Sequence, residues 1–374
     1  MYTYIVMLLI SLFFAGVLTW VKKQQGEYLC IKSFKIKKKY GEYCLLILSM
    51  LPFILISGFR RGIGYDYNIE YVPTFDAIAQ GADFANAGTE WGYYWINKLV
   101  IMLGGGYVWV FLVTSIITIG FFWCGFYQQS KNLCMSIVMF FCGEMFFLSM
   151  DGVRQFMGLA IAFYGFKYIK KRSFLKYAAF ILLGCLFHRS TIILLPLYVL
   201  SCIKINPLVM SALIGFGCAI NGSLKAIITY IVSYTPYAGY INSILFNGFD
   251  RILMARVFVY ALMFLVAGAF YFVKGNKDSH SYVFFFNTLS IGMFISLNAN
   301  IIPAPNRICW TLEIVLLLLV PMILESCDKK VVKYALGIAI VAAFSMSTYH
   351  EIIVLENQGA VPYVFTFMPY LVFK

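Results

Sequence analysis

The stretch that decides the fold runs from Cys44 to Tyr71 and reads CLLILSMLPFILISGFRRGIGYDYNIEY. Its first half is apolar enough to lie in a membrane, so Arg60 and Arg61 come at the bilayer boundary. Two glycines then allow the backbone to turn, and Asp66 follows between two tyrosines. Arginine forks bind phosphate in a bidentate way, and a carboxylate beside aromatic rings suits a sugar hydroxyl. The stretch therefore predicts a polar site at one face of a membrane.

The composition predicts an all-α, polytopic integral membrane protein. Hydrophobic residues make up 62% of the 374 residues and charged residues only 12%, whereas a soluble domain is about 25% charged. Apolar runs of membrane-spanning length recur along the chain. The net charge of +13 is concentrated as lysine in short loops between these runs. That is the positive-inside pattern of membrane proteins and does not indicate nucleic-acid binding.

The apolar runs and lysine loops predict a single transmembrane domain, residues 1–374, with about twelve spans and both termini outside. Residues 22–42 form a basic cytoplasmic loop, and residues 60–104 and 222–251 form two large outer loops, the first with a short interfacial helix at 91–103. The apolar stretch 177–201 is predicted to split at His188 into two short helices that meet at the outer face. The remaining spans are expected at about 1–20, 43–59, 107–127, 133–150, 153–169, 207–221, 252–273, 281–298, 308–325 and 333–350.

Lysine and arginine are distributed differently in this topology. It places 18 of 21 lysines inside but seven of eight arginines outside or at outer helix ends. Topology signals alone do not separate the two residue types, so an outer cluster of arginine indicates phosphate recognition. The outer arginines are Arg60, Arg61, Arg154, Arg189, Arg251, Arg256 and Arg307.

Several of these residues also have simpler interpretations. Arg60 and Arg61 could snorkel to lipid headgroups. Arg154 opposes the macrodipole at the start of a helix, so either Asp151 or a ligand phosphate is expected to compensate its charge. His188 could be a hydrogen-bonded core residue, although an arginine beside it in an apolar run favours a functional role. The sequence has no nucleotide-binding or metalloprotease motif, and we expect no cofactor, no metal and a pre-activated, membrane-borne substrate.

A series of short motifs runs along the chain. They are R-x-G-x-G-x-D-Y-x-x-x-Y from Arg60 to Tyr71, E-x-G-Y from Glu90, Val153-Arg154-Gln155, Lys176-Tyr177, Phe187-His188-Arg189-Ser190, Leu195-Pro196-Leu197-Tyr198 and Asn306-Arg307 with the later Pro321. Taken together, these motifs resemble the EpsG/Wzy-like family of bacterial O-antigen, capsule and exopolysaccharide repeat-unit polymerases. The resemblance covers about residues 45 to 325 and keeps the motif order. The family has Arg-Tyr where this chain has Arg60-Arg61, which leaves open which arginine is equivalent.

The resemblance implies a multi-pass inner-membrane glycosyltransferase with GT-C-like architecture. Its donor and acceptor would be undecaprenyl-diphosphate-linked oligosaccharides, joined at the periplasmic or outer face among membrane lipids, with a chain-length regulator as a further partner. Arg154, Arg307 and one or both of Arg60 and Arg61 would stabilise the departing diphosphate. Asp66 or His188 would take the proton of the acceptor hydroxyl, with Asp66 favoured. The other expected substrate-binding residues are Tyr67, Tyr71, Glu90, Gln155 and Arg189.

Two other functions handle the same substrate. A lipid-linked oligosaccharide flippase would line a central cavity with two related halves, and no internal repeat is visible in the sequence. An O-antigen ligase would share donor and chemistry but transfer to another acceptor, and only the ordered motifs favour a polymerase over it. A membrane acyltransferase would need a histidine near the cytoplasmic side, whereas His188 is predicted outside.

Overall fold

The computed structural model describes the chain except residues 32–33, 235–237, 242–250, 275–278 and 374. It is built mainly from helices, and its strands form two separate antiparallel pairs. The first pair joins β1 (Tyr28–Ile31) to β2 (Phe34–Lys37), and the second joins β3 (Tyr363–Phe365) to β4 (Met368–Phe373). The all-helical class predicted from composition is confirmed, because the membrane-spanning segments are all helices.

Six helical segments in the described part of the chain are long and apolar enough to cross a membrane, or eight if two bent pairs each count as one span. Three shorter apolar helices accompany them. The polytopic character is thus confirmed, whereas the expected number of about twelve spans is not. The six segments are α1 (Tyr2–Lys23), α2 (Lys38–Gly58), α5 (Tyr107–Gln129), α16 (His280–Leu297), α17 with α18 (Pro305–Glu325), and α19 with its π-helical end (Lys330–Val354).

The structure places helices and strands within the predicted loops, whose side of the membrane stays a prediction. In the loop predicted at 22–42, α1 extends to Lys23, α2 begins at Lys38, and β1 and β2 lie between them. The loop predicted at 60–104 is mostly helical, and helix 91–103 is present as α4. The loop predicted at 222–251 begins as a helix, and residues 242–250 lie outside the described part. The other helices are α3 (Val72–Ala79), α4 (Trp91–Met102), α6 (Leu133–Cys142), α7 (Met145–Asp151), α8 (Val153–Gly165), α9 (Lys167–Lys170), α10 (Phe174–Cys185), α11 (Leu194–Leu200), α12 (Pro207–Ala219), α13 (Asn221–Ser233) and α15 (Arg251–Lys274).

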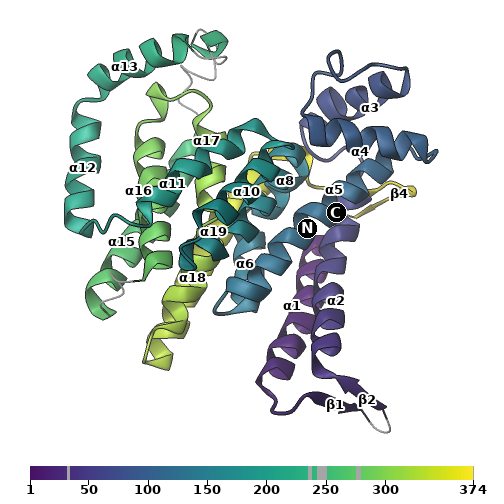
Figure 1. Cartoon of the computed structure of the whole chain (residues 1–374), viewed down its shortest axis with the longest axis horizontal. Helices are drawn as coiled ribbons and strands as arrows, with labels where there is room; N and C mark the ends of the chain where they lie inside the picture. The colour runs from purple at the N-terminus through teal and green to yellow at the C-terminus, as the bar shows by residue number, and fades with distance from the viewer. Residues whose placement is uncertain (32–33, 235–237, 242–250, 275–278, 374) are drawn as a thin grey trace.

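The α1–α2 hairpin separates two chemically different ends of the molecule. The lysine-rich β1–β2 hairpin lies at one end of these helices, and the segment that starts at Arg60 follows the other end of α2 (Figure 1). The 21 residues of α2 span roughly 30 Å, which is the thickness of a hydrocarbon core. A helix of this length would place the lysine-rich end and the arginine end at opposite faces of a membrane.

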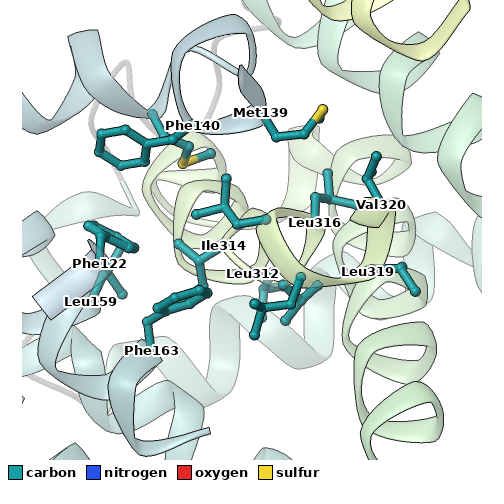
Figure 2. Close-up of a cluster of buried hydrophobic side chains, with 14 of the residues drawn as sticks. Phe122, Met139, Phe140, Leu159, Phe163, Leu312, Ile314, Leu316, Leu319 and Val320 are labelled. Atoms are coloured by element: carbon teal, nitrogen blue, oxygen red, sulfur yellow. The ribbon is translucent and has the colours of Figure 1, made fainter. Parts of the chain in front are cut away.

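The α17–α18 segment forms the centre of the hydrophobic core. Its second half, α18, is almost wholly apolar, and 78% of the segment's most apolar window is buried, as expected for a helix surrounded by others. Figure 2 shows side chains of α5, α6 and α8 packed against it. Ser136 of α6 donates a hydrogen bond to the Leu317 carbonyl (2.7 Å) within this core. The labelled residues are Phe122, Met139, Phe140, Leu159, Phe163, Leu312, Ile314, Leu316, Leu319 and Val320.

Two apolar stretches of the sequence are each broken into two helices. The expected helix 133–150 is divided into α6 and α7, which meet at 57°, because Glu144 at the junction has a left-handed backbone with φ 66°. The stretch 177–201 is split as predicted: α10 ends at Cys185, and a 3₁₀ turn, Arg189–Ile193, precedes α11. Both breaks place polar side chains within an otherwise apolar bundle.

The C-terminal segment returns to the arginine end of α2. The backbone N–H of Arg61 donates to the Val364 carbonyl (3.0 Å), and Thr366 N–H donates to the Phe59 carbonyl (2.9 Å). Gly64 N–H donates to the Gln358 carbonyl at 2.7 Å. Residues 358–366 therefore pair with the backbone that follows α2, and this pairing fixes the turn that carries Asp66.

Candidate active site

A polar cavity lies at the arginine end of the bundle. Its wall combines two arginines, two aspartates and a histidine with amide and aromatic groups, and these residues come from four separate parts of the sequence. They are Asp66, Tyr71, Asp151, Gly152, Arg154, Gln155, His188, Arg307 and Trp310. Six of the eleven residues predicted for the site therefore line one cavity.

The glycines of the first motif bring Asp66 to the cavity. Gly62 and Gly64 have φ of 68° and 100°, values that L side chains rarely adopt. A Cβ on Gly64 would lie 2.8 Å from the carbonyl oxygen of Met150, so only glycine allows this turn to approach the end of α7. The N–H of Asp66 donates to Asp151 Oδ1 at 3.2 Å. The two aspartates thereby lie side by side.

Arg60 does not line the cavity, although it stands in the first motif. Its side chain is 1% exposed, and its guanidinium donates to the backbone carbonyls of Ser57, Ile63 and Met150. The guanidinium carbon lies 4.4 Å from the ring centroid of Phe111. Arg60 therefore links the end of α2 to the end of α7. Arg61, by contrast, is exposed.

The two tyrosines of this motif differ in position. Tyr67 is buried and stacks on Phe111, with ring centroids 4.7 Å apart, so it packs behind the cavity. Tyr71 is 2% exposed and lines the cavity. Burial raises the pKa of Tyr71 well above its usual value, and the nearby charge of Asp66 raises it further. Its hydroxyl therefore stays protonated and can donate a hydrogen bond at neutral pH.

Arg154 is held by two carboxylates and a hydroxyl. Its Nη1 donates to Thr89 Oγ1 (3.0 Å) and to Glu90 Oε2 (2.5 Å), and its Nη2 donates to Glu70. These ion pairs supply the compensating charge that the sequence led us to expect from Asp151 or a ligand. Glu70 is more exposed than Glu90, with side-chain exposures of 33% and 12%. An incoming anion could therefore displace Glu70 more readily.

Glu90 also reaches His188. Its Oε1 lies 3.2 Å from His188 Nδ1, so one carboxylate contacts both the arginine and the histidine. The close approach depends on Gly92, whose N–H donates to the Leu186 carbonyl at 2.8 Å. A Cβ on Gly92 would lie 2.7 Å from the ring of Phe187. This contact gives the E-x-G motif a physical reason: the glycine lets the start of α4 lie against the turn that carries His188.

Gln155 and Arg307 connect α8 to α17. The Gln155 side-chain amide donates to the Arg307 carbonyl (2.8 Å) and to Thr311 Oγ1 (3.2 Å). Arg154 and Gln155 are neighbours, so this pair of bonds places Arg307 at the same cavity as Arg154. Arg189, although next to His188, is exposed and lies outside the cavity wall.

Sequence reasoning missed three residues of this site. Trp310 lies one helical turn after Arg307, a spacing that could have predicted its place on the same face. Asp151 was considered only as a counter-charge for Arg154. Glu70 gave no signal, because its contact with Arg154 joins residues 84 positions apart. Within the described residues, no group of three or more His, Cys, Asp or Glu side chains is placed to hold a metal ion.

The fold and this cavity define a polytopic helical membrane protein with a charged site at one end of its bundle. The EpsG family matches residues 43–365, so the chain belongs to the EpsG family. This membership indicates a polysaccharide-polymerase type of function in a membrane. No curated protein and no solved structure matches the chain.

Proposed function

We propose that this protein is a glycosyltransferase that joins undecaprenyl-diphosphate-linked repeat units at the outer face of the bacterial inner membrane. The observation that carries the proposal is the cavity itself. It places Arg154 and Arg307 beside two candidate proton acceptors, Asp66 and His188. Guanidinium groups suit a diphosphate, and an acceptor hydroxyl needs a base within reach. EpsG family membership supports the same class of reaction.

The reaction needs one bond to form as another breaks. The hydroxyl oxygen of the acceptor attacks the anomeric carbon of the donor glycan, and its proton passes to Asp66 or His188. The bond between that carbon and the diphosphate oxygen breaks, and the electron pair leaves with the diphosphate. Arg154 and Arg307 would stabilise the charge that develops there. Displacement of Glu70 would free part of Arg154 for the ligand, while Glu90 holds the guanidinium in place.

The proposal includes the membrane arrangement. The lysine-rich β1–β2 hairpin would face the cytoplasm, and the cavity, at the other end of α2, would face the periplasm or cell exterior. A GT-C-like architecture with additional spans, membrane lipids around the bundle and a chain-length regulator as a partner belong to the same proposal. The apolar surfaces of the bundle would hold the polyprenyl tails of donor and acceptor.

Deletion of the gene, followed by glycan ladder analysis, tests the function. Loss of a polymerase leaves single repeat units on the surface, whereas loss of a flippase or a ligase leaves none. Purified protein with a synthetic lipid-linked repeat unit provides the direct test, because a polymerase alone lengthens the lipid-linked product. Absence of any longer product from folded protein would contradict the proposal.

A further inference from the structure

We propose that Glu90 is a positioning residue that holds His188 as the proton acceptor of the reaction. The inference rests on the proposed glycosyl transfer and decides between its two candidate bases. Glu90 was expected to bind substrate, but a carboxylate repels a diphosphate. The structure gives it another role, because its two oxygens contact the arginine and the histidine of the cavity.

The geometry at His188 distinguishes its two ring nitrogens. Nδ1 is buried, and among the described residues it makes no well-aligned hydrogen bond. Glu90 Oε1 lies 3.2 Å away and could accept one. A small closure on substrate binding would complete this bond, as catalytic hydrogen bonds commonly do. An Nδ1–H directed at Glu90 makes Nε2 the lone-pair nitrogen of the neutral ring.

This arrangement fulfils the requirements for an activated base. The base lines the cavity, and a third group orients it from the nitrogen that does not react. When Nε2 takes the proton of the acceptor hydroxyl, the ring becomes an imidazolium, and the Glu90 carboxylate stabilises its charge. Asp66 has a different setting: its backbone is tied to Asp151, a second acid in the same wall. We therefore assign Asp66 to orienting the acceptor.

The backbone around Glu90 gives it the rigidity that a positioning residue needs. Glu90 precedes the first turn of α4, and its carbonyl accepts a hydrogen bond from Tyr94 N–H (2.9 Å). Gly92 fixes the same turn to α10 through the Leu186 carbonyl. On the other side, Gly158 of α8 packs against Gly184 of α10, where a Cβ would lie 2.9 Å from the Gly184 carbonyl oxygen. Helices α4, α8 and α10 thereby hold the Glu90 carboxylate, the Arg154 guanidinium and the His188 imidazole in fixed relative positions.

A double-mutant cycle tests the inference. Turnover at saturating donor is measured for purified wild type, Glu90→Gln, His188→Gln and the double variant, with a synthetic polyprenyl-diphosphate-linked repeat unit. We expect His188→Gln to lower turnover roughly 100-fold or more and Glu90→Gln to lower it at least tenfold. The double variant should be no slower than His188→Gln alone, because Glu90 acts through the histidine. If turnover of the double variant instead falls by the product of the two single-variant losses, the inference is wrong.

Glu70 provides the matched control, because it pairs with Arg154 but not with His188. Glu70→Gln combined with His188→Gln should show losses that multiply. Asp66→Asn should keep more than a tenth of wild-type turnover; a 100-fold loss there, with His188→Gln active, would make Asp66 the base and refute the assignment. If Glu90→Gln does not fold, Glu90→Asp replaces it in the cycle with the same criterion. Wild-type protein that forms no polymer would instead refute the proposed function.

Discussion

Replacement of Arg60 tests whether the first arginine of the motif supports the fold or binds a ligand. Arg60→Met keeps a long side chain but removes the donors to three buried backbone carbonyls. Each buried acceptor left without a partner costs about 1–3 kcal/mol, so we expect a loss of at least about 3 kcal/mol in unfolding free energy. Thermal unfolding in detergent should show a midpoint lowered by roughly 4 °C or more.

The adjacent arginine is the control for this experiment. Arg61 is exposed, so Arg61→Met should unfold within about 1 °C of wild type, since surface substitutions change stability by about 0.5 kcal/mol or less. Equal midpoints for both variants would refute the structural role of Arg60. A folded Arg60→Met protein that no longer binds lipid-linked donor would show instead that Arg60 contacts the ligand.

Three further predictions concern the site and its side of the membrane. Arg154→Lys and Arg307→Lys keep the charge but lose the bidentate fork, so each should weaken donor binding at least tenfold; normal polymerisation by both would exclude a diphosphate clamp. Gly92→Ala should lower turnover, because its Cβ would meet the turn after α10 at 2.7 Å, whereas Gly106→Ala, with nothing within 4 Å, should behave as wild type. In intact cells, a cysteine at Asp83 should react with an impermeant reagent and one in the β1–β2 hairpin should not, and the reverse pattern would invert the topology.

The sequence predicted best those helices whose apolar runs end in charged or glycine-rich segments. Helices α1, α2 and α5 lie within a few residues of their expected positions. The break between α6 and α7 was not predicted, because Gly143-Glu144 lies between two apolar runs that a single span would also explain. The break at His188 was predicted, since a split there keeps the later lysine-rich loops on the inner side.

The sequence predicted several residues of the site but not the contacts between them. The motifs named Arg154, His188 and Glu90, yet nothing in the sequence showed that Glu90 joins the other two, because such pairings depend on how α4, α8 and α10 cross. Adjacent arginines also cannot be told apart by sequence. Arg60 is buried and Arg61 exposed because the chain leaves α2 in a turn whose carbonyls converge on one guanidinium.

The C-terminal pairing with the segment after α2 has a consequence for biogenesis. Thr366 bonds to the backbone of Phe59 and Arg60, across 306 residues or more of sequence. The turn that carries Asp66 therefore lacks part of its hydrogen bonding until the last helix has been synthesised and inserted. Contacts of such long sequence separation form late and slowly. We expect the nascent protein to remain without a finished cavity until the segment around Thr366 has been synthesised and has paired with the end of α2.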